Sequence, residues 1–283
     1  MKLEFLSFDF DKFAAEMQNL KEKKGFDYLV TIVGEDFGEE GLGCIYILEN
    51  TNTNERCSVK MIAKTQICGD GIAINGTGET DGQMVPYIPT VSKIWRVADL
   101  LEREVYDFFG IVFLGHPDMR RLFLRSDFKG YPFRKDWKFD DSYTLEDDEE
   151  PDYGLEYYID KYGNLQSKRN KLFTSDEYVI NIGPQHPSTH GVLRLQTVLD
   201  GETVKRVYPH LGYIHRGIEK MCESLTYPQT LALTDRLNYL SAMMHRHALV
   251  GVIEEGLGVE LTDRIKYIRT IMDELQRIDS HLL

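Results

Sequence analysis

The sequence predicts an α+β protein with two domains, and three patterns lead to this class. Residues 9–24 carry apolar side chains at helical spacing, and residues 26–63 contain three β-branched or aromatic runs separated by polar turns. Residues 178–201 form a second pair of strand-like runs, and two long helical patterns follow them. We therefore expect an antiparallel sheet beside a helix in the first domain, and a small antiparallel sheet followed by long helices in the second.

The first domain is predicted to open with an amphipathic helix that ends before Gly25. The apolar residues of that helix are Phe10, Phe13, Met17 and Leu20. Strands are expected at residues 26–33, 44–48 and 58–63, and a second helix is expected from Ser92 to Gly110. The residues expected to face the core from this second helix are Ile94, Val97, Leu101, Val105 and Phe108. The residues on its opposite face, which is expected to be solvated, are Arg96, Asp99, Glu102, Arg103 and Asp107.

Composition and charge limit the kinds of function that the chain can have. Its 283 residues suffice for about two domains with ordinary cores. The net charge of −13 argues against nucleic-acid binding, which favours basic faces. The four cysteines form no C-x-x-C pair, so a zinc site or an iron–sulfur cluster built by this chain alone is not expected. The sequence shows neither a secretion signal nor an apolar run of the ~18 residues that span a bilayer, which predicts a cytoplasmic protein that can dock on a membrane assembly.

Two stretches of biased composition interrupt the domains. Gly69–Gly82 is rich in glycine, but it does not match G-x-G-x-x-G and prolines follow it, so we expect a hairpin insertion and no phosphate-binding loop. Asp140–Asp152 contains eight acidic residues in thirteen and no basic one. Because such a segment repels itself, we predict domains at residues 1–139 and 177–283, joined by an acidic linker at residues 140–176.

The most unusual stretch of the sequence is the loop Gly183–Gly191, which reads G-P-Q-H-P-S-T-H-G. Its prolines and terminal glycines disfavour a helix, strand-like runs flank it, and a hairpin signal follows at Asp200-Gly201. His186 and His190 are therefore expected on a loop between paired strands, where proteins often present functional groups. The residues alone also fit a structural turn whose histidines satisfy backbone groups. A metal site is disfavoured, because a proline breaks the helix face on which His-x-x-x-His binds metal best.

Two features of the first domain invite a functional interpretation. Gly115–Asp118 reads G-H-P-D, which is more typical of a capped structural turn than of a catalytic pair. Arg120, Arg121, Arg134 and Lys135 form a basic cluster in an acidic chain. That cluster suits a surface that binds a partner of acidic character.

The second domain is predicted to continue as two helices. The first begins at Pro228, a residue accepted at the first helical position, and ends before Gly256. Its apolar stripe comprises Leu233, Leu237, Leu240, Met244, Ala248 and Val252. Tyr239 lies off that stripe, and Asp263 is expected to cap the second helix. Two helices and a small sheet cannot cover their apolar stripes well, which predicts that more protein completes the domain.

Two sets of motifs resemble subunits of a known enzyme. L-E-R-E-V-Y-D-F-F-G-I-V-F-L-G-H-P-D-M-R-R at Leu101–Arg121, with G-Y-P-F-R-K-D at Gly130–Asp136, resembles the C subunit of respiratory complex I, the NADH:quinone oxidoreductase. The motifs that resemble its D subunit are N-I-G-P-Q-H-P-S-T-H-G-V-L-R-L (Asn181–Leu195), P-H-L-G-Y-I-H-R-G-I-E-K (Pro209–Lys220) and T-D-R-L-N-Y-L-S (Thr234–Ser241). Their order implies the fused C/D subunit of some bacteria. The resemblance implies a C-subunit-like α/β sandwich domain, followed by the start of a D domain similar to the large subunit of nickel–iron hydrogenases.

The resemblance implies roles for four residues. His190 and Tyr239 match residues that bind the quinone headgroup, which makes them the catalytic candidates, and His186 lies close by as a third quinone-binding residue. Arg216, in H-R-G, matches an arginine near the terminal iron–sulfur cluster of a partner subunit. Tyrosine side chains are protonated at neutral pH and histidine side chains exchange protons near it. Such a pair suits quinone reduction, which takes up two electrons and two protons.

A hydrogenase is excluded by the same comparison. Asn238 and Ser241 stand where the hydrogenase motif R-x-C-x-x-C supplies metal thiolates, so no metal site is expected. The resemblance implies instead a subunit of the peripheral arm that couples electron transfer to quinone reduction and proton translocation. Quinone is then the substrate, this chain alone binds no cofactor, and the iron–sulfur clusters lie in partner subunits. The implied partners are the B-type subunit with the terminal cluster, the I-type subunit and the H-type membrane subunit.

The implied location is the cytoplasmic side of the bacterial inner membrane, where the chain is peripheral. The D family continues far beyond a position like Leu283, so we expect the isolated chain to bind quinone poorly and to show no turnover. The competing hypothesis is a non-catalytic scaffold that assembles the peripheral arm and whose histidine loop has lost its role.

Overall fold

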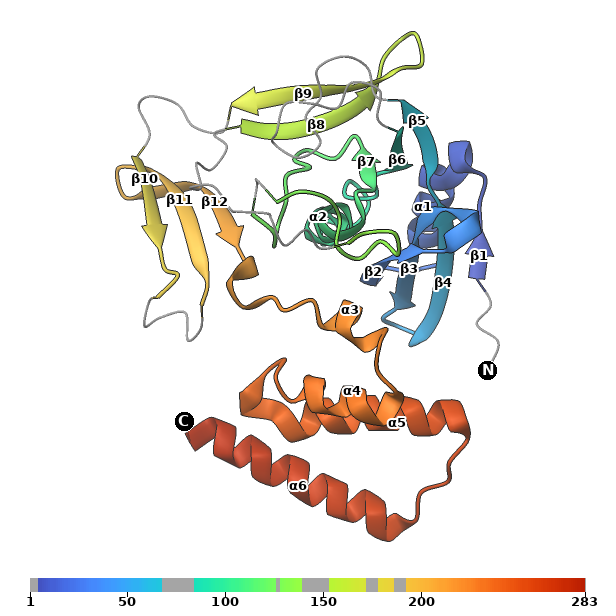
Figure 1. Cartoon of the computed structure of the whole chain (residues 1–283), viewed down its shortest axis with the longest axis vertical. Helices are drawn as coiled ribbons and strands as arrows, with labels where there is room; N and C mark the ends of the chain where they lie inside the picture. Colours follow the sequence, from blue (N-terminus) through green and yellow to red (C-terminus); the bar gives the residue numbers. More distant parts are fainter. Residues whose placement is uncertain are drawn as a thin grey trace. The chain divides into compact units, whose positions relative to one another are not determined.

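The computed structural model describes residues 5–67, 84–125, 128–138, 153–171, 178–185 and 192–282 (Figure 1). The described residues fall into two compact units, which meet in the sequence between His215 and Arg216. We call residues 5–215 the larger unit and residues 216–282 the helical unit, and each is described by itself. The mixture of sheets and helices agrees with the predicted α+β class. Gly69–Gly82 and Asp140–Asp152 lie outside the described residues.

The described part of the larger unit combines small sheets with two α-helices. Its strands are β1 (Phe5–Ser7), β2 (Tyr28–Asp36), β3 (Leu42–Asn50), β4 (Glu55–Ile62), β5 (Lys64–Ile67), β6 (Met84–Pro89), β7 (Val112–Leu114), β8 (Tyr153–Ile159), β9 (Leu165–Lys171), β10 (Tyr178–Ile182), β11 (Arg194–Asp200) and β12 (Thr203–His210). They pair in the orders β1-β4-β3-β2, β5-β6-β7, β8-β9 and β10-β11-β12. The helices are α1 (Phe13–Glu22) and α2 (Ala98–Phe109), with 3-10 turns at Phe10–Lys12, Gly38–Glu40 and Gly212–Ile214.

The first sheet and helix α1 confirm the sequence prediction. β2, β3 and β4 pair antiparallel, and β1 adds to the edge parallel to β4. Phe13, Met17 and Leu20 are buried on one face of α1. The ring of Phe13 lies 5.3 Å from that of Tyr46 on β3. The periodic apolar face of the helix is therefore the face that packs against the sheet.

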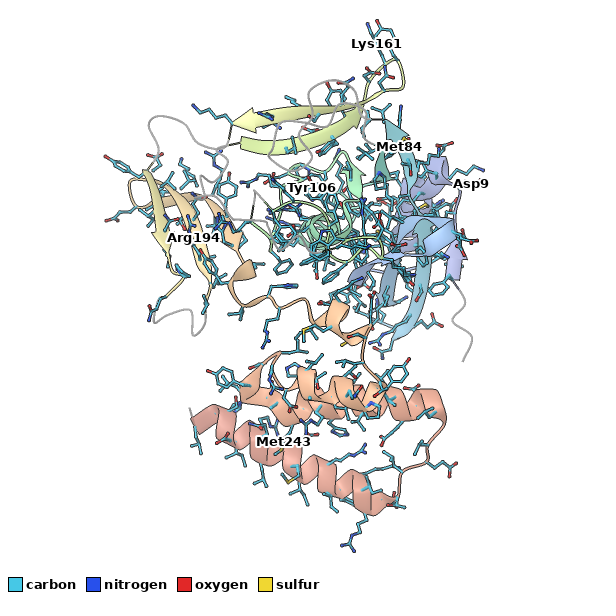
Figure 2. The ribbon with its side chains drawn as sticks, in the orientation of Figure 1. Asp9, Met84, Tyr106, Lys161, Arg194 and Met243 are labelled. Atoms are coloured by element: carbon cyan, nitrogen blue, oxygen red, sulfur yellow. The ribbon has the colours of Figure 1, made fainter. Side chains whose placement is uncertain are left out.

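Helix α2 begins later than predicted and buries much of its polar face. It starts at Ala98 instead of Ser92, and Tyr106 places it in the densely packed middle of the larger unit (Figure 2). Val97, which was expected in the core, is exposed. The prediction of a solvated polar face is wrong, because that face includes three buried residues, Glu102, Arg103 and Asp107. Charged side chains are rarely buried unless they are paired, and the partners of these three come from the segments that precede and follow the helix.

Residues 153–171, which lie within the predicted linker, form a hairpin of the larger unit. β8 and β9 pair antiparallel, and Leu155, Tyr157 and Leu165 are buried with residues of the first domain. The backbone N–H of Met119 donates to the carbonyl oxygen of Leu155 at 2.6 Å. The packed structure around the first domain therefore extends beyond residue 139, and the two compact units differ from the predicted domain ranges.

The sheet β10-β11-β12 is antiparallel throughout, as predicted for the strands around the histidine loop. β11 ends at Asp200 and β12 begins at Thr203, with these two residues facing each other across the hairpin. The turn predicted at Asp200-Gly201 is therefore confirmed.

The helical unit comprises α3 (Ile218–Cys222), α4 (Tyr227–Thr234), α5 (Ala242–Leu257) and α6 (Asp263–Leu282), drawn in orange to red in Figure 1. The prediction of one helix from Pro228 to Gly256 is wrong, because α4 ends and α5 begins within that range. Asn238 adopts an extended conformation between them (φ −150°, ψ 100°), and its side chain accepts a hydrogen bond from the N–H of Leu240 at 3.2 Å. Asparagine competes for the backbone in this way and so interrupts a helix.

Helix α6 is present as predicted, but Asp263 is its first residue and not the cap before it. The helix packs against α5 with polar contacts. The guanidinium of Arg269 on α6 donates two hydrogen bonds of 2.7 Å to the carboxylate of Glu254 on α5. Nδ1 of His247 on α5 lies 2.6 Å from the carboxylate of Asp273. Much of the apolar surface of α6 is exposed, and its members are Ile265, Ile268, Ile271, Met272, Leu275, Ile278 and Leu282.

Candidate functional site

The loop that carries the two candidate histidines is held at both ends by β-structure. β10 pairs with β11 up to Ile182 and Leu195, and an isolated antiparallel bridge then joins Gln185 to Val192. His186 and His190 themselves lie outside the described residues. The prediction that the loop connects paired strands is confirmed, and its two ends are brought together at the bridge.

Gly183 is the residue that lets the two ends of the histidine loop approach each other. Its φ of +90° lies in the left-handed region, and the Gly183–Pro184 peptide bond is cis. A Cβ atom at Gly183 would lie 2.0 Å from the carbonyl oxygen of Leu193. Only glycine fits this backbone position without displacing β11.

We expect Gly183→Ala to destabilise the larger unit by about 1–3 kcal/mol, because the new methyl group meets backbone atoms that cannot move aside cheaply. Urea unfolding of the chain, followed by circular dichroism, measures the change. Gly201→Ala is the matched control, since Gly201 also has a positive φ (+60°) but no atom within 4 Å of its Cβ position. Equal losses in the two variants would contradict the role assigned to Gly183.

Tyr239, the second catalytic candidate, lies on the 3-10 turn Tyr239–Ser241 between α4 and α5. Its side chain is 75% exposed. Two hydrogen bonds hold the residue that follows Tyr239: the Leu240 N–H donates to the side chain of Asn238, and Gln276 on α6 donates to the Leu240 carbonyl oxygen at 3.1 Å. The structure therefore presents an exposed phenol group on a hydrogen-bonded turn.

Arg216, the residue expected near a partner's iron–sulfur cluster, is exposed at the start of the helical unit. Gly217 follows in the left-handed conformation (φ +62°) and precedes α3. Tyr239 belongs to the same unit, whereas the strands that hold the histidine loop belong to the larger unit. The structure thus places two of the four candidates in one unit and the base of the loop in the other.

His215, which the sequence analysis overlooked, has a different environment from the arginine beside it. Its ring stacks on Phe108 of α2 with the ring centres 4.7 Å apart, and lies 4.8 Å from the ring of Phe123. Phe108 also stacks on Phe133 at 4.3 Å. The aromatic residues of the C-like motifs and the histidine of H-R-G therefore form one cluster, and the consecutive aromatics at Phe108 were the signal for it in the sequence.

Asp107 is the centre of a buried polar cluster that the sequence analysis also overlooked. One carboxylate oxygen accepts hydrogen bonds from the backbone N–H groups of Leu122, Phe123 and Leu124 at 3.1, 2.6 and 2.9 Å. The other accepts from the guanidinium of Arg121 at 2.9 Å, and both side chains are nearly inaccessible to solvent. Burial alone would lower the pKa of Arg121, but the charge and hydrogen bond of Asp107, together with Tyr131 and Tyr106, outweigh burial and raise it.

The cluster around Asp107 corrects the interpretation of the basic residues. Arg121 is buried and also donates to the carbonyl oxygens of Phe128 and Gly130, so it is not part of a partner-binding surface. Arg134 donates to the carbonyl oxygen of Phe109 at 2.6 Å. These two arginines hold the loops that follow β7 in place.

Glu102 and His116 complete the polar interior of the first domain. Oγ1 of Thr90 and the N–H of Val91 donate to the Glu102 carboxylate at 2.5 and 2.7 Å. Burial raises the pKa of Glu102 to about 7, although these hydrogen bonds favour its charged form. His116 is fully buried, and its Nδ1 accepts the N–H of Asp118 at 3.0 Å. The interpretation of G-H-P-D as a capped structural turn is therefore confirmed.

The sequence is similar to that of known proteins over most of its length. Residues 6–143 match the family described as "Respiratory-chain NADH dehydrogenase, 30 Kd subunit". The C/D subunit of the NADH-quinone oxidoreductase of Phocaeicola vulgatus is 53% identical over 96% of this chain. The C/D subunit of the Bacteroides thetaiotaomicron enzyme is 50% identical over 95% of this chain. The chain belongs to the family of NADH-quinone oxidoreductase C/D subunits.

The similarity to C/D subunits extends beyond the C-like part of the chain and includes less similar relatives. The C/D 2 subunit of Aquifex aeolicus is 36% identical over 93% of this chain. The chain spans about half the length of the curated relatives that it matches, with 50% of the Phocaeicola and 44% of the Aquifex protein covered. The histidine loop, Arg216 and Tyr239 lie beyond the residues that match the 30 Kd family. No helix among the described residues is long and apolar enough to cross a membrane.

Proposed function

We propose that the chain contributes the quinone-binding site of a complex I peripheral arm, and couples electron transfer from partner iron–sulfur clusters to quinone reduction and proton translocation. The observation that carries this proposal is Tyr239, an exposed phenol on a turn fixed by Asn238 and Gln276. The names of the relatives, which are C/D subunits of NADH-quinone oxidoreductases, support it. The similarity of the loop Gly183–Gly191 to the D-subunit motif supports it further.

The proposed chemistry uses Tyr239 and His190 as hydrogen-bond donors to the two carbonyl oxygens of a quinone. Negative charge develops on these oxygens as electrons arrive, and donors placed in advance stabilise it. Each side chain can then pass its proton to the oxygen that it contacts. His186 is proposed to line the same headgroup pocket.

The proposed setting is an assembly of subunits on the cytoplasmic side of the inner membrane. The B-type subunit with the terminal iron–sulfur cluster is proposed to lie near Arg216, whose exposed guanidinium suits a charged or polar interface. The I-type and H-type subunits are the other proposed neighbours. This chain alone is proposed to bind no cofactor, and the isolated chain to be inactive.

The test is quinone-reductase activity of membranes that carry the full-length protein, with assembly of the complex checked by native gel electrophoresis. We expect His190→Ala and Tyr239→Phe each to lower activity by about tenfold or more while the complex still assembles, because each removes one proton donor. Tyr227→Phe is the matched control, since Tyr227 is 73% exposed in the same unit. Unchanged activity in both test variants would leave the scaffold hypothesis as the better description of the chain.

A further inference from the structure

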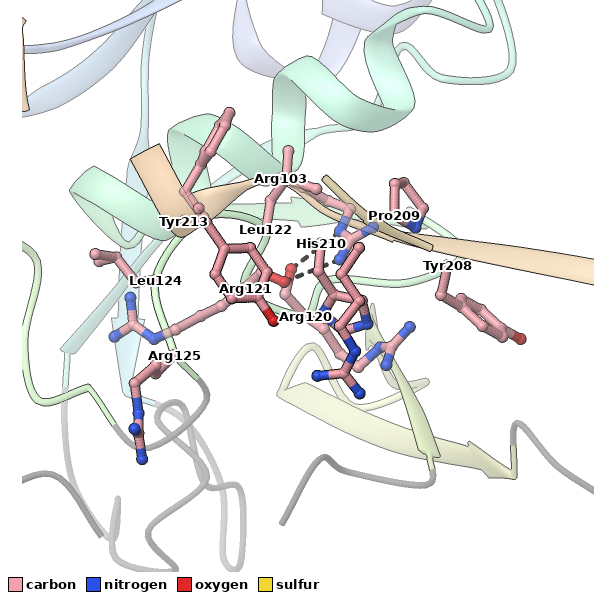
Figure 3. Close-up of a pocket in the computed structure, with 13 residues that line it drawn as sticks. Arg103, Arg120, Arg121, Leu122, Leu124, Arg125, Tyr208, Pro209, His210 and Tyr213 are labelled. Carbon is pink, nitrogen blue, oxygen red and sulfur yellow. Dashed lines mark hydrogen bonds between the residues drawn. The ribbon is translucent and has the colours of Figure 1, made fainter. Parts of the chain in front are cut away.

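A second candidate site is lined only by residues of the larger unit, and none of them is a proposed quinone residue. A pocket of about 380 Å³ opens between the loop after β7 and strand β12 (Figure 3). Its lining residues are Arg103, Arg120, Arg121, Leu122, Phe123, Leu124, Arg125, Arg194, Tyr208, Pro209, His210, Gly212 and Tyr213. Five of them are arginines, and none of these described lining residues is acidic. In a chain with a net charge of −13, this concentration of positive charge needs an explanation.

Two of the arginines that line the pocket pair with carboxylates. Arg121 pairs with buried Asp107, and Arg120 pairs with Asp118 through hydrogen bonds of 2.8 to 3.0 Å. Arg103 instead donates to the carbonyl oxygens of Arg120 and Arg121 at 3.0 and 2.9 Å. Carbonyl oxygens orient a guanidinium without neutralising it, so Arg103 adds a fixed positive charge at the wall of the pocket.

The pKa of His210 is affected by the arginines that line the pocket. Figure 3 shows it close to Arg103 and Arg120. Its pKa is lowered to about 4, first by burial and then by the charges of Arg194, Arg120 and Arg103. The imidazole is therefore neutral at pH 7, because burial disfavours its charged form and the charges of the arginines add to that effect.

The remaining walls of the pocket are apolar or aromatic. Tyr208 lies under the guanidinium of Arg120, which is 5.2 Å from the centre of its ring. Leu122, Phe123 and Tyr213 complete this side. A ligand of the pocket can thus place an anionic group among the arginines and a planar or apolar group against the rings.

The geometry points to a binding site for a small phosphate monoester whose remaining part is planar or apolar. Guanidinium groups from three separate elements, α2, the loop after β7 and β11, can each donate to a different phosphate oxygen, which a carboxylate with two oxygens matches less well. The volume suits a ligand of this size. The phosphate can belong to a soluble molecule or to a lipid headgroup, and the test distinguishes these sources.

The first experiment titrates the 283-residue chain with phenyl phosphate by isothermal titration calorimetry, at constant ionic strength in chloride. We expect one site, and at least about tenfold weaker binding of benzoate, which has the same ring but a carboxylate. Arg194→Gln is expected to weaken phenyl phosphate binding by about tenfold, because it removes a charged donor. The matched control is Arg206→Gln, which changes an arginine on β12 that does not line the pocket and is expected to leave binding within about twofold.

The second readout is the pKa of His210, measured from its ring proton resonances. Bound phosphate offsets the repulsion from the arginines, so saturating phenyl phosphate is expected to raise this pKa above its ligand-free value of about 4. Cosedimentation with phosphatidic acid vesicles, if it is lost in Arg194→Gln, assigns the site to a lipid phosphate; absence of cosedimentation assigns it to a soluble one. The proposal is overturned if the folded chain fails to bind phenyl phosphate, if benzoate binds equally well, or if Arg206→Gln weakens binding as much as Arg194→Gln.

Discussion

Asp107→Ala is expected to lower the free energy of unfolding by about 3–5 kcal/mol, the cost of leaving a buried charge without its partner. The substitution removes the carboxylate from Arg121, which stays buried, and it removes the acceptor for three consecutive backbone N–H groups at Leu122–Leu124. Unsatisfied buried donors add to the loss. Urea unfolding of the chain, followed by circular dichroism, measures it.

Asp11→Ala is the control for this prediction. Asp11 also pairs with a cation, Lys64, at 2.9 Å, but its side chain is 86% exposed. Exposed ion pairs contribute about 0–1 kcal/mol, so the control should change stability little. If Asp107→Ala were no more harmful than Asp11→Ala, the carboxylate would not be the centre of the loops that follow β7.

Glu102→Gln is expected to remove a pH dependence of stability worth about 3 kcal/mol, the equivalent of a pKa rise from 4.5 to about 7. Between these pH values the folded protein keeps the proton of Glu102 and the unfolded chain has released it. The contribution of this group is therefore complete below pH 4.5 and is lost as pH rises to 7. The glutamine amide can still meet Thr90 and Val91, and it does not titrate.

The measurement compares the unfolding free energies of the wild type and Glu102→Gln across this pH range. Their difference cancels the contributions of other titrating groups, so it should shift in favour of the variant as pH rises. A difference that stays level across this pH range would contradict the raised pKa of Glu102.

Helical periodicity, alternating strand patterns and turn residues predicted several helices, strands and turns correctly. Helix α1, the strands β2 to β4, the turn after Asp200 and helix α6 all follow from periodicity or turn residues. The polar face of α2 could not be predicted in the same way. Its buried polar side chains bond to Thr90, Val91 and the loop at Leu122–Leu124, and the periodic pattern of a helix does not show which flanking segment folds back onto it.

Some features of the candidate site could likewise be predicted from local sequence, and others could not. The bridge at Gln185–Val192 was foreseeable, because strand-like runs enclose a loop rich in proline and glycine. The role of Tyr239 came from resemblance alone, and its apolar neighbours at helical spacing predicted a continuous helix where Asn238 interrupts it. His215 and the arginine pocket depend on contacts between segments about a hundred residues apart, such as His215 with Phe108, and no local pattern shows these.

Within the larger unit, the segment that contains the C-like motifs packs closely against the segment at Tyr208–His215. His215 stacks on Phe108, the Arg120 guanidinium covers Tyr208, and a Cβ at Gly212 would lie 1.7 Å from the carbonyl oxygen of Phe123. Because one chain carries both surfaces, their effective concentration is about millimolar and their ratio is fixed at one to one, while the contact itself resides in the side chains.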